Sequence, residues 1–446
     1  NLGSNIFLGE ISYITKALVA VLQLGVTTDF SIFLYHSYEK KKKEYANKED
    51  AMADAIKETF TSVIGSSLTT TAGFLVLCTM KLTLGKDLGI VMAKGVLLGV
   101  VTVLTVFPSL LLLLDKYIEK TKHKSLAINF SKLNNFIVKH HVAFFVIFLV
   151  LVIPCYLAYS KVDVYYKIDK SLPSTLESIK ANEELKNKFN IVSPEILLVP
   201  SDMKSNDIND MVSEIKTIDG IDFVLSFDEL KKLGISENML SDDVVSIFKN
   251  DKYEMILVNS LYEVASDELN DQITDLNKVV DKYDKNIIVA GEGPLMKDLI
   301  NISDTDFNNV NYSSIICILV ILFFVLKSFS LPILLIAAIE TAIFINMSFS
   351  YFGGVVLPFV APIVLGTIQL GATIDYAILM TTNYLERRKT MAPKEAMVDT
   401  LNYCTNSVFV RGLCFFAATF GVAVFCDFEM VGSLCTLISR GAIVSM

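Results

Sequence analysis

Long apolar runs recur along this chain and are separated by polar segments. A run of about 18 apolar residues is long enough to cross the hydrocarbon core of a bilayer as an α-helix. Nine runs come near or above this length, at residues 11–38, 61–80, 88–114, 142–159, 312–326, 331–351, 355–384, 407–425 and 431–446. The pattern predicts a polytopic α-helical membrane protein.

The pattern changes between the fourth and fifth runs, in residues 161–308. Apolar stretches there shorten to strand length, at 195–199, 221–225, 255–258 and 286–290. They alternate with amphipathic helical patterns at 178–190, 207–217, 242–249 and 267–283, and another helical pattern at 294–309 leads into the fifth run. Short strands that alternate with helices predict an α+β domain of the β-α-β type.

Composition and charge agree with a membrane protein and indicate its orientation. Hydrophobic residues make up 52% of the 446 residues and the mean hydropathy is +0.51, more than a soluble chain normally carries. The positive-inside rule predicts three cytoplasmic loops, after the first, third and seventh runs. Residues 161–308, with 16 Lys/Arg and 30 Asp/Glu, then lie outside the cytoplasm of a plasma-membrane protein. The basic residues of the three loops are Lys40–Lys43, Lys116, Lys120, Lys122, Lys124, Arg387, Arg388 and Lys389.

One motif occurs twice inside the apolar runs. Gly25-Val-Thr-Thr-Asp29-Phe30 in the first run reappears as Gly371-Ala-Thr-Ile-Asp375-Tyr376 in the seventh. Parallel repeats with sites at the repeat interface recur among transporters, so we expect two parallel pseudo-repeats. Each would contain three spans and a cytoplasmic amphipathic helix. An offset of 345 or 346 residues also aligns Ala51 with Ala396, Ser62 with Ser407, Ser66 with Arg411, Lys94 with Arg440 and Gly95 with Gly441.

The two aspartates form the main candidate site. A charged side chain near the middle of a span costs about 2.5–3.5 kcal/mol and usually marks an ion or proton pathway. Gly25 and Gly371 each precede an aspartate by four residues and therefore lie on the same helix face as Asp29 and Asp375. A missing side chain there lets a neighbouring helix or a water approach the carboxylate. Such a pair could load and release protons, and a purely structural role for the buried aspartates is the alternative.

These features resemble a known group of membrane proteins. Two Gly-x-x-x-Asp-Phe/Tyr motifs with an α+β domain between them are similar to the resistance-nodulation-division (RND) superfamily. The stretches Gly9–Lys16 and Phe415–Phe420 look most like its MMPL branch. The resemblance covers essentially the whole chain and implies two halves, each with one span, a porter domain and five further spans.

The resemblance also implies four parts in this chain. Residues 1–125 would be the last three spans of the first half, and 126–160 a linker and the first span of the second half. Residues 161–308 would be an extracytoplasmic ferredoxin-like porter domain, and 309–446 the remaining spans of the second half. The first span, first porter domain and next two spans of a whole family member would be missing, so we expect the chain to be a fragment.

Family members pair each aspartate with the aromatic hydroxyl that follows the other aspartate. The resemblance therefore implies a pair between Asp29 and Tyr376. Phe30 has no hydroxyl to offer Asp375, which departs from the family pattern. Asp375 would need another donor, such as Thr27, Thr28 or a water.

Two further charged residues inside the apolar runs could be coupled to the pair. Arg411 in the eighth run could be the counter-ion of either aspartate, or its side chain could reach the cytoplasmic interface instead. Glu340 in the sixth run could belong to a relay or form a hydrogen bond between helices. The hydroxyls of Thr69–Thr71 could line a water wire, although bonding back to their own helix is the simpler interpretation.

Nothing in the sequence indicates an enzyme. The turn around Gly291 lacks the Gly-Lys-Ser/Thr of a nucleotide-binding loop, and the seven cysteines have no zinc or disulfide spacing. We expect no cofactor, no metal and no nucleic-acid partner. The four histidines, which show neither ligand nor triad spacing, are His36, His123, His140 and His141.

We therefore expect a secondary transporter in which proton-motive force drives export of lipids or other amphiphiles across the plasma membrane. Its partners would be a lipid or hydrophobic substrate, protons and membrane lipids. Two other interpretations are a protein-translocation accessory of the same superfamily and a lipid- or sterol-sensing membrane receptor. The sequence leaves open the substrate, the choice between protons and sodium, and whether copies of the chain form a homo-oligomer.

Overall fold

A computed structural model describes residues 1–121, 129–167, 172, 174–232 and 242–446. Lys122, His123 and Lys124 of the sequence analysis lie outside the described residues. The chain divides into two compact units. We call residues 1–164 and 305–446 the membrane unit, and residues 165–304 the α+β unit.

Helices form almost all of the membrane unit. Eight described helices are long and apolar enough to cross a membrane, which confirms the predicted polytopic helical class. The ninth predicted run forms α15, a helix of 17 residues that is not among these eight. The helices are α1 (Tyr13–Lys41), α2 (Lys48–Val76), α3 (Thr83–Thr121), α4 (Ser131–Lys139), α5 (His141–Tyr159), α11 (Glu292–Leu326), α12 (Ser330–Phe352), α13 (Val360–Arg387), α14 (Pro393–Phe425) and α15 (Glu429–Ser445), with 3-10 turns at Gly3–Leu8 and Leu77–Thr79 and short strands β1 (Val164–Tyr165) and β6 (Leu357–Pro358).

The predicted amphipathic segment of each repeat is helical and continues into the following span as one helix. The residues around Ala51 form the first part of α2, and those around Ala396 form the first part of α14. The Asn47 side chain caps α2 by accepting from the Glu49 N–H at 3.2 Å. Proline stands at the start of α14, where a missing N–H leaves no helical bond unmade. No proline or glycine then interrupts α2 before Gly65, so one helix continues into the apolar span.

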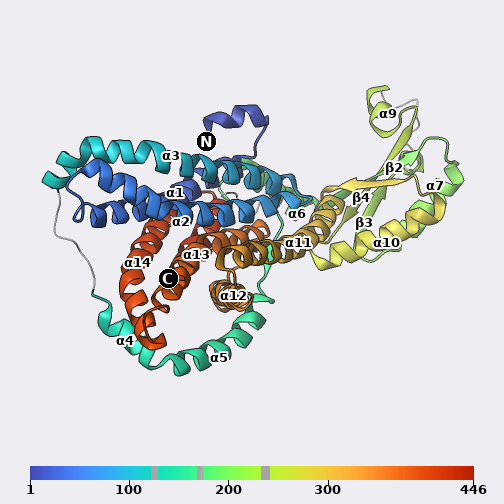
Figure 1. Cartoon of the computed structure of the whole chain (residues 1–446). Helices are drawn as coiled ribbons and strands as arrows, with labels where there is room; N and C mark the ends of the chain where they lie inside the picture. Colours follow the sequence, from blue (N-terminus) through green and yellow to red (C-terminus); the bar gives the residue numbers. More distant parts are fainter. Residues whose placement is uncertain (122–128, 168–171, 173, 233–241) are drawn as a thin grey trace. The chain divides into compact units, whose positions relative to one another are not determined.

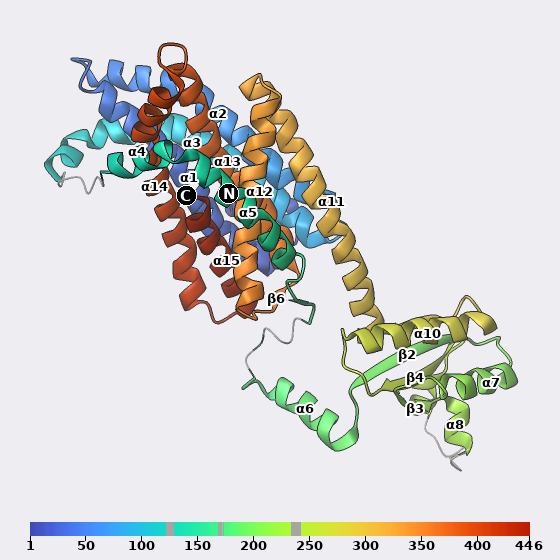
Figure 2. The ribbon, with the colours of Figure 1, turned by 90° about the horizontal axis from the view of Figure 1, so that it is seen from below.

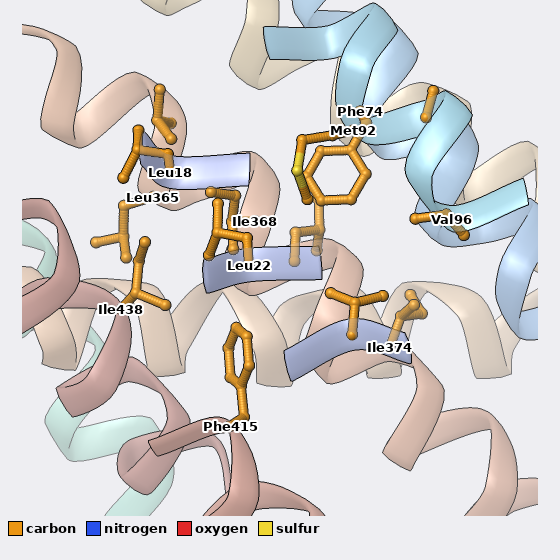
Figure 3. Packing of buried hydrophobic residues seen from close by; sticks show 14 of the residues in the cluster. Leu18, Leu22, Phe74, Met92, Val96, Leu365, Ile368, Ile374, Phe415 and Ile438 are labelled. Carbon is orange, nitrogen blue, oxygen red and sulfur yellow. The ribbon is translucent and has the colours of Figure 1, made fainter. Parts of the chain in front are cut away.

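The two helices that carry the aspartates, α1 and α13, each contact several other helices. The neighbours of α1 are α2, α3 and α14, and those of α13 are α2, α12, α14 and α15 (Figures 1 and 2). Leu22 of α1, Ile368 of α13 and Phe415 of α14 meet in one buried cluster (Figure 3). The most apolar stretch of α13 is 78% buried, whereas that of α5 is 6% buried. Helix α13 is therefore enclosed by protein, α1 is partly buried, and α5 presents an apolar surface outward, as a lipid-facing helix does.

The α+β unit contains four strands in one sheet, and they confirm the four predicted strand segments. The sheet order is β3-β4-β2-β5, and every neighbouring pair is antiparallel. Leu197 and Val199 on the buried face of β2 pack with Met211 of α7 and Val280 of α10. The elements are α6 (Glu177–Phe189), β2 (Ser193–Pro200), α7 (Ser205–Ile215), β3 (Ile221–Leu225), α8 (Phe227–Lys232), α9 (Asp242–Phe248), β4 (Tyr253–Ser260), α10 (Asp267–Tyr283) and β5 (Ile288–Gly291), after which α11 begins.

Candidate functional site

The two aspartates lie at one cavity, on α1 and α13. Asp29 lies on α1 and Asp375 on α13, and each is 6% exposed. Both carboxylates line one small cavity of about 30 Å³. A water needs roughly 10–15 Å³ of such space, so the cavity has room for one or two waters.

The glycine one turn before each aspartate faces a helix from the other part of the chain. A Cβ atom on Gly25 would lie 2.3 Å from Cδ2 of Phe415 on α14. A Cβ atom on Gly371 would lie 3.9 Å from Cα of Thr70 on α2, an ordinary contact distance. At Gly25 the space is thus filled by a ring and not by water, whereas Gly371 leaves α2 close beside Asp375.

Each aspartate has a hydrogen-bonding partner on a neighbouring helix. The Tyr376 hydroxyl donates to Oδ2 of Asp29 at 3.4 Å, which is the pair that the resemblance implied. The Thr70 hydroxyl donates to Oδ2 of Asp375 at 3.5 Å and also contacts the carbonyl oxygen of Gly371. Ser66, one turn before Thr70, lines the cavity and interacts with the Asp375 carboxylate.

Two of the donors that we expected for Asp375, Thr27 and Thr28, are wrong, and a water remains a prediction. The hydroxyl of Thr27 donates to the carbonyl of Gln23 at 2.7 Å, and that of Thr28 to the carbonyl of Leu24 at 2.6 Å. Both threonines follow the ordinary habit of bonding back to their own helix. Phe30 lines the cavity with its ring but brings no hydroxyl.

Arg411 lines the same cavity as the two aspartates. It is 5% exposed, lines the cavity and lies with its guanidinium 5.1 Å from the ring centre of Phe33. The side chain is thus buried and does not reach out to an interface. Among the described residues, no ion pair within 4 Å joins Arg411 to a carboxylate.

Three buried polar atoms at this cavity lack a hydrogen-bonding partner within the part of the chain that the structure describes. They are Oδ1 of Asp29, Oδ1 of Asp375 and Nε of Arg411. Buried polar atoms without partners are costly and uncommon in folded proteins.

Two other cavities flank the site. One of about 810 Å³ shares Phe33 and Leu379 with the aspartate cavity and extends to Lys40 and Glu58. A much smaller one, of about 10 Å³, is lined by Gln369 and by Tyr376. Two further spaces, with mostly apolar walls, therefore adjoin the aspartate cavity near α13.

Glu340 lies apart from the aspartates. It is on α12, is partly buried, and its Oε1 has no hydrogen-bonding partner among the described residues. Its electrostatic neighbour is Tyr159 of α5. Glu340 does not line the aspartate cavity, so the structure does not bring it together with the other candidates.

Sequence reasoning did not assign Ser66 or Thr70 to the site. A signal was available, because the 345-residue offset aligns Ser66 with Arg411 and Thr70 with Phe415. Ser66 and Arg411 both line the cavity. Thr70 faces Gly371, and Phe415 faces Gly25. The hydroxyls of Thr69 and Thr70 bond back to their own helix, as predicted. The Thr70 hydroxyl also contacts the Asp375 carboxylate.

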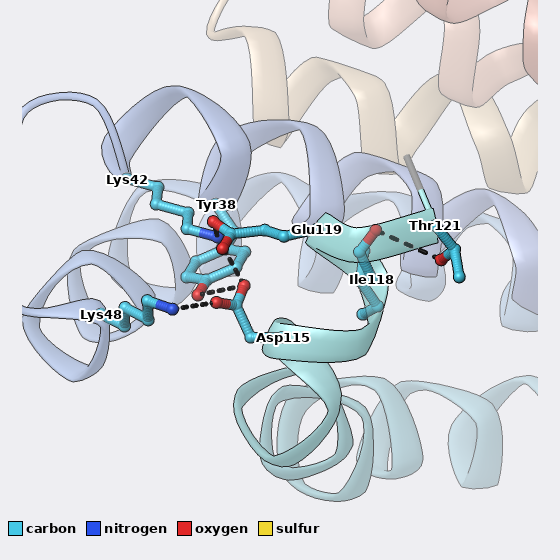
Figure 4. Close-up of polar contacts among 7 residues, drawn as sticks. All are labelled: Tyr38, Lys42, Lys48, Asp115, Ile118, Glu119 and Thr121. Atoms are coloured by element: carbon cyan, nitrogen blue, oxygen red, sulfur yellow. Dashed lines mark hydrogen bonds and ion pairs between the residues drawn. The ribbon is translucent and has the colours of Figure 1, made fainter. Parts of the chain in front are cut away.

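A second polar cluster was also missed. Asp115 on α3 is 3% exposed and accepts from Nζ of Lys42 at 2.6 Å, from the hydroxyl of Tyr38 at 3.3 Å and from Nζ of Lys48 (Figure 4). Lys42 also pairs with Glu119 at 2.5 Å. Asp115 thus ties the end of α1 and the start of α2 to α3.

The membrane unit defines the class of protein: a polytopic helical membrane protein with an ionisable site inside its bundle. The described residues contain no group of three or more His, Cys, Asp or Glu side chains that could hold a metal ion. The chain belongs to the MMPL family, whose family model matches residues 3–140 and 200–446. The family predicted from the two motifs is thereby confirmed.

Two relatives show how far the similarity extends. The chain is 31% identical over 104 residues to ActII-3 of Streptomyces coelicolor, which is named as a membrane protein. It is 30% identical over 94 residues to MmpL4 of Mycobacterium leprae, which is named as a transport protein. These matches cover 23% and 21% of this chain, and 15% and 10% of the two relatives.

Proposed function

We propose that this protein is a secondary transporter in which proton movement through the Asp29 and Asp375 site drives export of a lipid or other amphiphile. The observation that carries this proposal is the set of three unpartnered polar atoms around one water-sized cavity. A purely structural buried aspartate is expected to have its hydrogen bonds made by protein. Here one oxygen of each carboxylate has no partner among the described residues, and both side chains line a water-sized cavity.

The charges at the cavity support a cycle of proton loading and release. Two carboxylates and one guanidinium line the space, so the site carries one excess negative charge when both aspartates are ionised. One bound proton removes that excess. An ionised carboxylate only accepts hydrogen bonds, whereas a protonated one also donates. Protonation therefore changes the bonds that join Tyr376 to Asp29 and Thr70 to Asp375, and with them the contacts of α13 with α1 and α2.

The flanking cavities support a route for the proton. The 810 Å³ cavity reaches Lys40, in the loop region that the positive-inside rule predicts to be cytoplasmic. The cavity at Gln369 and Tyr376 lies toward the opposite end of α13. A charge that crosses the membrane supplies about 2.3 kcal/mol per 100 mV, so one or two protons per cycle are a sufficient source of energy for moving an amphiphile.

Matching contacts in the two parts of the membrane unit support the pseudo-repeat. The Asn1 amide donates to Oε1 of Gln23 at 2.7 Å and to the carbonyl of Val91 at 3.0 Å. The Asn346 amide donates to Oε1 of Gln369 at 2.9 Å and to the carbonyl of Leu437 at 2.9 Å. Each member of the second set follows its counterpart by 345 or 346 residues, the offset of the aspartate motifs.

The α+β unit supports a second part of the proposal. Its β-α-β-β-α-β order, with the sheet order β3-β4-β2-β5, is that of a ferredoxin-like domain. We propose that this unit is a porter domain outside the cytoplasm of a plasma-membrane protein. Its net negative sequence and its place between two predicted extracytoplasmic span ends favour that side.

The test is gradient-driven efflux of a fluorescent amphiphile from proteoliposomes that carry the full-length protein. Wild type is compared with Asp29→Asn, Asp375→Asn and, as a matched control, Thr28→Val. The control removes a hydroxyl that bonds only its own helix on the same span. We expect each aspartate variant to lose most of the efflux, the control to keep it, and a protonophore to abolish it in wild type.

Other outcomes separate the alternatives. Undiminished efflux in both aspartate variants would overturn the proton site. Amphiphile binding that survives both substitutions and loss of the gradient, without efflux in wild type, would favour a lipid-sensing receptor. Gradient-dependent movement of a secreted polypeptide without amphiphile efflux would favour a translocation accessory.

A further inference from the structure

A separate cavity of about 360 Å³ lies between α12, α14 and α15, away from the aspartate pair. Its lining includes Ser350 at the end of α12, Cys426 after α14, and a face of α15. The charge pattern predicts these ends of the helices to be extracytoplasmic. The cavity thus adjoins the outer boundary of the second half, and its volume is in the range of small-molecule sites.

A polar stripe on α15 forms one wall. Glu429, Ser433, Thr436 and Arg440 all line the cavity. Their spacing of four, three and four residues places them on one face of the helix. At 1.5 Å per residue, Glu429 and Arg440 are about 16 Å apart along the axis, so the carboxylate and the guanidinium are at opposite ends of the stripe.

Arg440 lies at the end of the polar stripe far from Glu429, and it is a cation without a carboxylate partner among the described residues. Its Nε donates to Oδ1 of Asn346 at 2.7 Å, and its Nη2 donates to the carbonyl oxygen of Asn346 at 2.7 Å and to the Ser350 hydroxyl at 2.9 Å. Among the described residues, Nη1 has no hydrogen-bonding partner and no carboxylate lies within ion-pair distance. An arginine inside a span is costly and is normally paired or functional.

The rest of the lining is apolar and continues outward into exposed apolar surface. Val355, Leu357, Ala423 and Leu437 line the cavity beside the polar stripe. Near its ends the side chains of Phe352, Val356 and Phe425 are exposed. A cation and hydroxyls next to an apolar wall match a molecule with an anionic head and hydrocarbon chains.

We propose that this cavity binds the anionic headgroup of an amphiphile, with the Arg440 guanidinium as the direct ligand of a phosphate or carboxylate group. The bonds to Asn346 and Ser350 hold the guanidinium in place, and Nη1 is left to bind the ligand. Arginine is well suited to this role because its planar donors match phosphate and carboxylate oxygens. The proposal concerns binding, and it stands whether or not the aspartate pair moves protons.

The chain offers a matched control for Arg440. Lys94 aligns with Arg440 by the 346-residue offset and lies on α3. Its Nζ donates to Oδ1 of Asn5 at 2.5 Å, and it does not line this cavity. A loss of charge at Lys94 therefore tests for a general effect of removing a cation from a span.

The experiment is native mass spectrometry of the full-length protein in detergent micelles, titrated with phosphatidylglycerol or with phosphatidylcholine of the same chains. We expect wild type to bind phosphatidylglycerol about tenfold more tightly, a difference of about 1.4 kcal/mol, because the guanidinium forms a charge-assisted hydrogen bond with the anionic headgroup. Arg440→Gln should remove this preference, Arg440→Lys should keep part of it, and Lys94→Gln should leave it unchanged. Ser433→Leu, which fills the cavity and keeps the charge, should weaken phosphatidylglycerol binding.

Two results would overturn the proposal. The first is an unchanged preference for phosphatidylglycerol in Arg440→Gln, which lacks the cation, or unchanged phosphatidylglycerol binding in Ser433→Leu, which lacks the space. The second comes from a competition experiment, in which glycerol phosphate or inorganic phosphate is added to the lipid-bound protein. Displacement of the lipid by either at equal concentration would show a site for free anions and not for an amphiphile. If Arg440→Gln does not fold, Ser433→Leu and Arg440→Lys still decide the outcome.

Discussion

The ring of Phe415 occupies the space that a side chain at Gly25 would need. A Cβ atom there would lie 2.3 Å from Cδ2 and 2.7 Å from Cε2 of that ring. This contact fixes how closely α1 and α14 approach one turn before Asp29, and α14 also carries Arg411. The glycine of the motif is therefore needed for packing between helices at the site.

Gly25→Ala should destabilise the bundle by about 1–3 kcal/mol, the usual result of overpacking a filled core. Efflux should fall with it, because Phe415 and Arg411 lie on the same helix. Gly371→Ala is the matched control, since its Cβ would be 3.9 Å from the nearest atoms and alanine favours the helix. Thermal unfolding of the full-length protein measures both, and equal losses in the two variants would contradict this account.

Phe30→Tyr should introduce a hydroxyl at the cavity that Phe30 and Asp375 both line. If a reciprocal aromatic hydroxyl matters, efflux should rise or its pH optimum should shift, because Asp375 gains a donor. Phe33→Tyr is the control, since Phe33 lines the same cavity but lies over Arg411. An unchanged rate and pH profile for Phe30→Tyr would show that Asp375 does not need a reciprocal aromatic hydroxyl.

Asp115→Asn should lower the free energy of unfolding by about 1.5–3 kcal/mol, because it weakens the charge-assisted bonds from Lys42 and Lys48 to a buried carboxylate. Glu119→Gln removes another carboxylate from Lys42, but this side chain is 52% exposed. Exposed pairs contribute about 0–1 kcal/mol, so the second variant should be near wild type. Denaturation of both proteins in the same detergent provides the comparison, and a loss for Glu119→Gln as large as for Asp115→Asn would count against the cluster.

The α+β unit should become less stable as the pH rises from about 4.5 to about 7. Burial raises the pKa of Glu195 on β2 from the usual 4.5 to about 7, even though the Ser193 hydroxyl donates to the carboxylate at 2.7 Å. The folded unit holds the proton more tightly than the unfolded chain, so stability is full below pH 4.5 and falls until pH 7. The total loss is of order 3 kcal/mol, and Glu195→Gln should abolish it.

Hydrogen exchange of the β2 amides in the full-length protein, corrected for intrinsic exchange rates, measures this effect. Glu268→Gln on the exposed face of α10 controls for the loss of a negative charge. A wild-type protection that stays constant between pH 5 and 8 would rule out a buried protonated Glu195.

Much of the architecture followed from the chain alone because it depends on local patterns. Eight apolar runs became helices long enough to cross a membrane, and the strand pattern of the α+β unit was correct. The aspartate motifs indicated the family, which the family model confirms. Helix boundaries were less well predicted: the amphipathic patterns before two spans merged with those spans, since no residue in α2 breaks the helix before Gly65.

The contacts of the site could not be read from the chain. Periodicity assigns a face to each helix, but it does not say which distant residue meets that face. The sequence determined that Asp29 and Asp375 are carboxylates within apolar helices and that Phe30 lacks a hydroxyl. Only the tertiary structure decided that Thr70 and Ser66 contact Asp375 and that Arg411 is buried at the same cavity. It also decided that Arg440 lines a cavity. The physical reason is that each of these contacts joins helices far apart in the chain.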